Sequence, residues 1–234
     1  MMIKITKNLI DKNFSKRDNN NIKYIVIHDT ANPNKGSNAE AHFKYFNSKN
    51  LDASAHFFVD DGKILQIIEE YNRAWHCGDG KGKNKITNDN SIGVEMCINS
   101  DGDFEKTIEN TIKLSTYLLD KYNLDINCLV RHFDASGKIC PNEFCENNWE
   151  KWNDFKNKVK FNLDILITPF DKNKIDYYVN GIYKLILERE PDGEGFNYWT
   201  NRVKNKKDLK DFINTVIDSK EYDLIINKLN TNKV

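Results

Sequence analysis

The sequence predicts an α/β protein, in which a central mixed β-sheet is flanked by helices and followed by a small all-α domain. Apolar, β-branched segments alternate with amphipathic helical segments over residues 1–160. After residue 174 only helical periodicity remains. Because strands that alternate with long helices favour a partly parallel sheet, we expect one domain over residues 1–160, a linker over 161–173 and a helical domain over 174–234.

The composition is that of a globular protein and excludes some partners. The 234 residues are 39% hydrophobic and 30% charged, and 35 basic residues balance 35 acidic ones. A net charge of zero gives no electrostatic argument for a nucleic-acid partner. No segment approaches the roughly 20 apolar residues of a membrane span. The five cysteines are irregularly spaced and form no C-x-x-C pair, which argues against a disulfide framework.

Three elements are expected in the first part of the chain. The strand "IKYIVIH" ends at His28, and a helix over residues 37–50 has Ser37 or Asn38 as its N-cap. The segment "HFFVDDGKILQII" has the pattern of two strands joined by a turn at Asp61-Gly62. These elements predict a strand, a helix and a hairpin in that order.

The next three elements continue the alternation. In "SIGVEMCI", Ile92, Val94, Met96 and Ile98 share one face of a strand, whereas Gly93, Glu95 and Cys97 share the other. An amphipathic helix follows over residues 104–124. The apolar strand "INCLVRHF" (126–133) again leads to a histidine, His132.

The two histidines at strand ends suggest a metal site. In open α/β sheets, functional groups gather at the carboxyl ends of the strands. Cys140 follows His132 by eight residues and precedes Pro141, so we expect it at the start of a helix on the same edge. Two histidines and a cysteine with one open position fit a catalytic zinc ion. Histidines satisfied within the core remain the alternative.

Five ordered motifs then resemble one family. The segments "IVIHDTANP", "ASAHFFVDDGKILQ", "AWHCGDG", "SIGVEMC" and "RHFDASGKICP" are similar to those of the type 2, zinc-dependent N-acetylmuramoyl-L-alanine amidases of phage endolysins and bacterial autolysins. The match covers about residues 20–160. It implies cleavage of the amide between the muramoyl lactyl group and L-alanine of bacterial peptidoglycan.

The resemblance also implies roles for single residues. His28, His132 and Cys140 would bind Zn²⁺, and Lys138 would stabilise the oxyanion. Glu95 would activate or position the attacking water. Some relatives have an aromatic residue before the histidine of "ASAHF", where this chain has Ala55, which leaves Glu95 as the obvious base.

Other polar and aromatic residues are expected near the substrate. We expect His76 and Trp75 of "AWHCGDG" to line the substrate groove, with His56 packed beside the site as a further candidate contact. His42 lies in a helical segment, which favours a structural role. The glycine-rich segment 78–84 lacks the strand–loop–helix order of a phosphate site and is expected at the edge of the groove.

Two other functions stay open from the sequence. Cys140 could be a nucleophile with His132 as its base, in a cysteine hydrolase. This leaves His28 and Glu95 without roles. Alternatively, the chain could be a non-catalytic peptidoglycan-binding protein, although all three candidate ligands are present.

The ends of the chain suggest where it acts. The segment "MMIKITKNLI" lacks the apolar core and cleavage site of a signal peptide. We therefore expect synthesis in the cytoplasm without membrane insertion, and access to the cell wall after holin-type release or lysis. The helical segment resembles a domain of unassigned function in bacterial surface proteins, through Tyr183, Arg189, Pro191, Asp192, Gly195, Tyr198 and Trp199. It is expected to bind the host cell wall or to mediate self-association.

Overall fold

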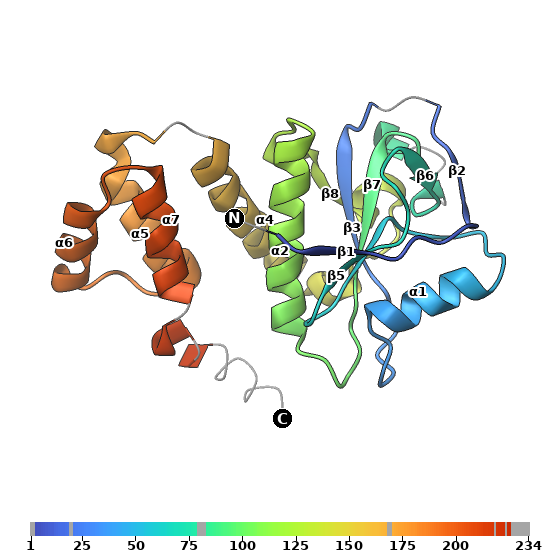
Figure 1. The fold of residues 1–234 in the computed structure, drawn as a ribbon, viewed down its shortest axis with the longest axis horizontal. Helices are drawn as coiled ribbons and strands as arrows, with labels where there is room; N and C mark the ends of the chain where they lie inside the picture. The colour runs from blue at the N-terminus through green and yellow to red at the C-terminus, as the bar shows by residue number, and fades with distance from the viewer. Residues whose placement is uncertain are drawn as a thin grey trace. The chain divides into compact units, whose positions relative to one another are not determined.

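A six-stranded sheet forms the centre of the N-terminal part of the chain (Figure 1). The computed structural model describes residues 3–18, 21–78, 83–167, 170–217, 219–222 and 224–225. The strands follow the order β1 (Ile5–Lys7), β5 (Ile64–Gln66), β4 (Phe57–Val59), β7 (Ser91–Met96), β3 (Tyr24–Asp29) and β8 (Leu129–Arg131). Only the pair of β4 and β5 is antiparallel among these neighbours. The predicted mixed sheet is therefore confirmed.

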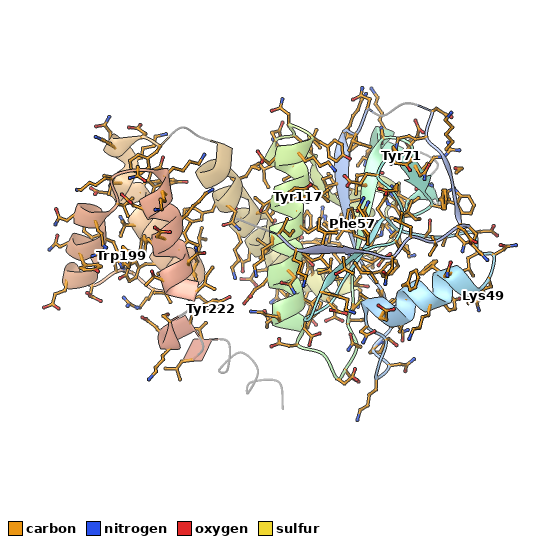
Figure 2. The ribbon with its side chains drawn as sticks, viewed as in Figure 1. Lys49, Phe57, Tyr71, Tyr117, Trp199 and Tyr222 are labelled. Atoms are coloured by element: carbon orange, nitrogen blue, oxygen red, sulfur yellow. The ribbon has the colours of Figure 1, made fainter. Side chains whose placement is uncertain are left out.

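One face of the sheet carries the main hydrophobic core. The buried side chains Ile92, Val94 and Met96 pack against α2 (Phe104–Lys121) and α4 (Glu146–Ile167). Phe57, which is labelled in Figure 2, belongs to the same core. The alternation predicted for residues 91–98 is correct here, because it sends Glu95 to the opposite face.

Helix α1 (Ala39–Ser48), labelled in Figure 1, covers the opposite face, to which Glu95 points. Asn38 is the N-cap of α1, and its side-chain oxygen accepts from the Ala41 N–H at 3.0 Å. A separate two-stranded sheet pairs β2 (Phe14–Lys16) with β6 (Asn72–Ala74). The short 3₁₀ turn η2 (Lys83–Lys85) follows.

Local hydrogen bonds explain how two of the connections form. The predicted hairpin joins β4 to β5, and one Asp60 carboxylate oxygen accepts from the N–H groups of Gly62 and Lys63 at 2.9 and 2.7 Å. The strand expected over residues 126–133 is shorter, because the 3₁₀ turn η3 (Ile126–Cys128) precedes β8. Asp134 then accepts from the Arg131 N–H at 2.8 Å, so that α3 (His132–Ser136) begins immediately after β8.

The chain divides into the units Met2–Leu163 and Asp164–Val234. Helix α4 continues to Ile167, through part of the expected linker, because Val159 and Leu163 remain on its buried stripe. Pro169, which we expected within the linker, lies outside the described residues, as do Met1 and Met2, residues 79–82 of the glycine-rich segment and residues 226–234.

The C-terminal unit is helical, as predicted. The 3₁₀ turn η5 (Lys172–Lys174) precedes α5 (Ile175–Ile186), α6 (Gly193–Arg202) and α7 (Lys206–Ile217). Trp199, labelled in Figure 2, stacks on Phe212 with ring centroids 4.0 Å apart. Asp192 caps α6 by accepting from the Gly195 N–H at 2.7 Å. In the part of the chain that the structure describes, no helix is long and apolar enough to cross a membrane.

Candidate metal centre

A row of three residues crosses the sheet on the face that α1 covers. His28 on β3 is in register with Glu95 on β7, which is in register with Phe58 on β4. Side chains in register on parallel strands point to the same side, and neighbouring strands lie about 4.8 Å apart. The row therefore places an imidazole, a carboxylic acid and an aromatic ring side by side.

A folded loop returns Cys140 to His132. The Phe133 N–H donates to the Cys140 carbonyl at 3.0 Å, and Gly137 ends α3 in the left-handed conformation with φ 87°. One Asp29 carboxylate oxygen accepts from the Glu143 N–H at 2.9 Å and holds the far side of the loop. Pro141 precedes a single 3₁₀ turn, η4 (Asn142–Phe144), so the α-helix expected after Cys140 is not formed there.

The three predicted ligands converge. The Nδ1 atoms of His28 and His132 lie 3.0 Å apart, and the Cys140 sulfur lies 3.7 Å from His28 Nδ1. All three donor atoms lie within 4.8 Å of one another and are buried. Tetrahedral zinc bonds place two nitrogens about 3.3 Å apart, and a nitrogen and a sulfur about 3.6 Å apart. The donor set and its spacing therefore fit a zinc ion.

A buried hydrogen-bonded chain fixes the tautomer of His28. The Ser91 hydroxyl donates to the Thr87 carbonyl at 2.6 Å, so its oxygen accepts from His76 Nε2–H at 3.2 Å. His76 Nδ1 is then an acceptor for His28 Nε2–H at 3.1 Å. The Nδ1 lone pair of His28 is left pointing at His132 and Cys140. An outer partner that orients a histidine ligand in this way is typical of metal centres.

The position of His76 depends on Gly93. A Cβ at residue 93 would lie only 2.6 Å from Cγ of the His76 ring. Asn88 accepts from the backbone N–H groups of His76 and Cys77 at 2.9 and 2.7 Å. Burial, followed by the nearby His56, lowers the pKa of His76 well below its usual range, so the ring is neutral as the hydrogen-bonded chain requires.

None of the three residues expected at the substrate, His56, His76 and Trp75, lines the pocket that opens beside Glu95. His56 is fully buried, and its Nδ1 accepts from the Gly93 N–H at 3.0 Å. Its pKa is lowered to about 3 by burial. His76 is 8% exposed and lies behind His28. The Trp75 indole N–H donates to Ser15 on β2 at 3.2 Å. The structure therefore gives these three side chains contacts within the protein.

Glu95 and Lys138 are the acid and the cation that the resemblance places in the reaction. Burial, followed by Asp29, raises the pKa of Glu95 well above its usual range. One Glu95 carboxylate oxygen is buried without a hydrogen-bond partner among the described residues. Lys138 is exposed, and its positive charge lowers the pKa of Glu95 and of His28. Glu95 is therefore in register beside His28, and the charge of Lys138 acts on both residues.

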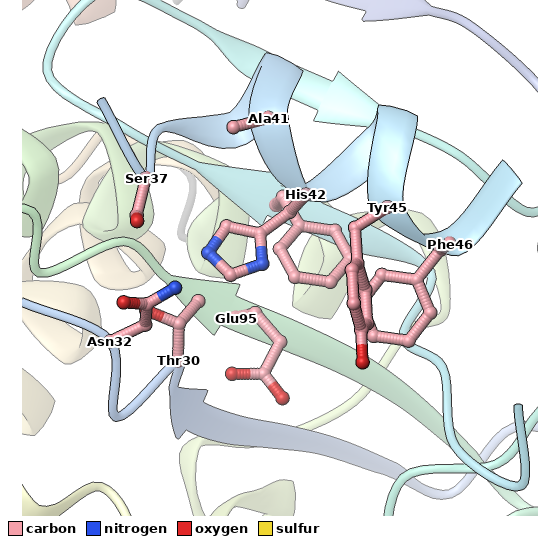
Figure 3. A pocket seen from close by; sticks show the side chains of 9 residues that line it. Thr30, Asn32, Ser37, Ala41, His42, Tyr45, Phe46 and Glu95 are labelled. Carbon is pink, nitrogen blue, oxygen red and sulfur yellow. The ribbon is translucent and has the colours of Figure 1, made fainter. Parts of the chain in front are cut away.

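A pocket of about 420 Å³ opens beside Glu95 (Figure 3). We call it the Glu95 pocket, and it is lined by Thr30, Asn32, Ser37, Ala41, His42, Tyr45, Phe46, Phe58 and Glu95. The residues of α1 form one wall and Glu95 lies opposite, as Figure 3 shows. Three of the lining residues, Thr30, His42 and Glu95, each have a buried polar atom without a partner in the described chain.

The sequence did not predict several residues and contacts of the Glu95 pocket and the candidate metal centre. His42 was expected to be structural, yet it lines the Glu95 pocket. Thr30 follows His28 by two positions, and its N–H donates to the Met96 carbonyl at 3.0 Å. That spacing in an extended chain could have placed it on the face of His28. The contact between His76 and Gly93 had no signal, because it joins a loop to a strand.

Comparison with known families bears on this site. Residues 18–143, more than half of the chain, match the family model described as N-acetylmuramoyl-L-alanine amidase. This chain belongs to that amidase family. The matched segment contains His28, Glu95, His132 and Cys140, and the resemblance inferred from the five motifs is confirmed.

Several curated relatives of the amidase domain come from Bacillus subtilis (strain 168). The N-acetylmuramoyl-L-alanine amidase CwlH is 40% identical over 136 residues, which cover 58% of this chain and 52% of CwlH. The amidase XlyA is 38% identical over 133 residues, covering 57% of this chain and 42% of XlyA. This chain therefore spans about half the length of these relatives.

Solved structures support the amidase fold. The catalytic domain of XlyA is 34% identical with a TM-score of 0.60, and the match covers 67% of this chain and 99% of that domain. The structure of PlyL is 30% identical with a TM-score of 0.57, covering 68% of this chain and 98% of PlyL. Residues 171–224 match a separate domain of unknown function.

Proposed function

We propose that this chain is a peptidoglycan hydrolase that cleaves the amide bond between N-acetylmuramic acid and L-alanine. One observation carries the proposal: His28, His132 and Cys140 converge at zinc-ligand spacing beside Glu95. Three protein ligands that leave one position open are typical of a catalytic rather than a structural zinc site. Membership of the amidase family supports the choice of bond.

The residues around the site suit amide hydrolysis. A zinc ion bound by His28, His132 and Cys140 would supply Lewis acidity for the reaction. Glu95 takes a proton from the attacking water and delivers it to the leaving nitrogen of L-alanine. The Lys138 ammonium donates to the oxyanion that develops on the lactyl carbonyl. The products are a free lactyl carboxylate and a free amino group on the peptide.

Burial of its thiol disfavours Cys140 as a nucleophile. A nucleophilic cysteine needs a lowered thiol pKa. Burial, followed by the nearby Glu95, raises the pKa of the Cys140 thiol well above its usual range. A metal-ligand role instead displaces the thiol proton on binding. A purely binding function is also disfavoured, because all three ligand atoms are in place.

Release and targeting belong to the same proposal. The relatives are named as amidases, and a solved relative is titled an endolysin from Bacillus subtilis. We propose that the chain acts on the wall as an endolysin, after holin-type release or lysis. The C-terminal unit would hold the enzyme on the wall and raise its local concentration there. Self-association of this unit is the alternative.

Digestion of isolated bacterial cell walls tests the proposed bond. New amino groups should appear on L-alanine, without new reducing sugar ends. Reducing ends without new amino groups would indicate a glycosidase and would contradict the proposal. A chain truncated after residue 163, checked for folding by circular dichroism, should cleave soluble muropeptides and lyse whole cells less well. Equal lysis of whole cells would contradict the targeting role.

A further inference from the structure

The Glu95 pocket contains a set of polar atoms that the protein itself leaves unsatisfied. Thr30 Oγ1, His42 Nε2 and Glu95 Oε2 are buried and have no hydrogen-bond partner among the described residues. All three residues line the same cavity of about 420 Å³. Buried polar groups are almost always hydrogen-bonded, because leaving one unpaired destabilises the protein. Three in one cavity point to a ligand that satisfies them.

His42 presents an acceptor to this cavity. Its ring hydrogen-bonds to the backbone of Ser37, and that bond raises the pKa of His42. A bond that favours the charged ring is one in which the ring N–H donates. Because Nε2 is the unpartnered atom, Nδ1 is the donor and Nε2 carries the lone pair. Burial is the larger effect and lowers the pKa, so the ring is neutral.

The walls of the pocket are aromatic. His42 stacks on Phe58 with ring centroids 5.0 Å apart and an angle of 9° between the rings. Phe46 packs against Phe58 at 5.4 Å, and Tyr45 is 47% exposed at the rim. Figure 3 shows these α1 side chains facing Glu95 across the cavity. An occupant therefore needs an apolar face together with at least one hydrogen-bond donor, for His42 Nε2.

The charge of the lining selects among the parts of the substrate. No lysine or arginine is among the residues that line the pocket. The pocket therefore offers no cation that could pair with a carboxylate. The peptide stem beyond L-alanine carries carboxylates, whereas the muramoyl sugar ring is neutral and bears hydroxyl and amide donors. The lining therefore favours the sugar over the peptide.

The distance from the metal centre also fits the sugar. Phe58 lies two strands from His28 in the same in-register row, which is about 10 Å at the usual strand spacing. Glu95 lies between them and belongs to both regions. The muramoyl ring is joined to the scissile carbonyl through the short lactyl arm. A carbonyl beside Glu95 would therefore place the ring over the pocket.

We infer that the Glu95 pocket binds the N-acetylated muramoyl sugar on the glycan side of the scissile bond, with His42 Nε2 accepting a hydrogen bond from it. The inference rests on the proposed amidase function and names the part of the substrate that this pocket binds. It assigns His42 as a specificity-determining residue, because only a donor-bearing occupant satisfies its lone pair.

Binding of the two halves of the substrate tests this inference without turnover. The zinc-loaded full chain, labelled with ¹⁵N, is titrated with N-acetylmuramic acid and separately with L-alanyl-D-glutamate. N-acetylmuramic acid should shift the His42 ring signals, and the dipeptide should leave them in place. Shifts caused by the dipeptide instead, or by neither compound up to its solubility limit, would overturn the inference.

Two variants distinguish the contribution of the His42 hydrogen-bond acceptor from that of its aromatic ring. His42→Phe keeps an aromatic ring that can stack on Phe58. It should weaken the binding of N-acetylmuramic acid about three- to tenfold, which is the contribution of one neutral hydrogen bond. His42→Gln restores an acceptor and should recover most of that loss. Unchanged affinity in a folded, zinc-loaded His42→Phe protein would overturn the inference. Wall digestion by the parent chain is measured separately, so a failure of the amidase proposal is distinguishable.

Discussion

The candidate metal centre and the Glu95 pocket share one face of the sheet, but their buried polar groups differ in whether the protein itself supplies hydrogen-bond partners. Around His28, the outer nitrogen Nε2 has a partner, and the hydrogen-bonded chain runs through His76 to Ser91 and the Thr87 carbonyl. In the neighbouring pocket, Thr30, His42 and Glu95 each keep an unpartnered atom within the described chain.

The difference teaches how the fold separates two tasks. Ligands for a metal must be held in one orientation before the metal arrives, so their outer atoms are hydrogen-bonded by the protein. A substrate pocket must leave hydrogen-bonding capacity for an occupant that comes and goes. Glu95 lies at the boundary, since its row neighbours are His28 on one side and Phe58 on the other.

Replacing the boundary residue Glu95 should have the largest effect among the four positions considered next, Glu95, Lys138, His76 and Asp192. Glu95→Gln should lower turnover by about 10²–10⁴-fold while zinc content stays intact, because the proton-transferring group is lost. Assays of amino groups released on L-alanine measure this. Digestion of walls at the parent rate would exclude Glu95 as the base.

Although Glu95→Gln should lose turnover, it should be more stable to unfolding than the parent at neutral pH. Folding raises the pKa of Glu95, so the unfolded chain ionises first, and this group costs stability as the pH rises above its usual 4.5. Glutamine does not ionise. Metal-free Glu95→Gln should therefore gain stability over the metal-free parent between pH 4 and pH 7, as urea unfolding at both pH values would show. A constant difference would contradict the buried-acid account.

Lys138 is exposed, and its charge acts on both His28 and Glu95. Lys138→Ala should lower turnover by about 10²–10³-fold, the usual effect of losing one oxyanion donor. Because Lys138 is exposed and binds no metal, zinc content should not change. Its matched control is Lys44→Ala on α1, which is also exposed and lines neither region. Equal activity in the two variants would remove Lys138 from the mechanism.

The hydrogen-bonded chain behind His28 can be broken without replacing any of the three candidate metal ligands. His76→Ala removes the acceptor for His28 Nε2–H and should weaken zinc binding by about 10- to 100-fold, as measured by competition with a chelator. His76→Asn places an oxygen near the former Nδ1 and should lose less. Equal zinc affinity in parent and His76→Ala would show that the chain does not orient His28.

The smallest effect is expected in the C-terminal unit. There, Asp192 and Gly195 of the motif that resembles a domain of unassigned function make contacts that support the fold. Asp192 caps α6, and a Cβ at Gly195 would lie 2.4 Å from the Tyr183 hydroxyl. Asp192→Ala should cost about 1 kcal/mol of stability, and Asp192→Asn should cost less because it keeps a capping oxygen. Thermal unfolding followed by circular dichroism measures both. No difference between them would contradict the capping role.

Local patterns in the sequence predicted much of this arrangement. Alternation in residues 91–98 placed Glu95 opposite the core, and the turn at Asp61-Gly62 predicted the hairpin. The roles of His42 and His76 were not accessible, because they depend on how α1 and the loop before β7 pack on the sheet. Such contacts arise between segments distant in sequence, which periodicity and capping signals do not describe.

The central claim is that His28, His132 and Cys140 hold one catalytic zinc ion. The most direct measurement is the bound zinc per chain in the purified parent, in Cys140→Asp and in Cys140→Ala, with wall digestion followed on the same samples. We expect one zinc in the parent, partial zinc and partial activity in Cys140→Asp because a carboxylate also binds zinc, and loss of both in Cys140→Ala. A parent that digests walls without bound metal, or a fully active Cys140→Ala, would contradict the claim.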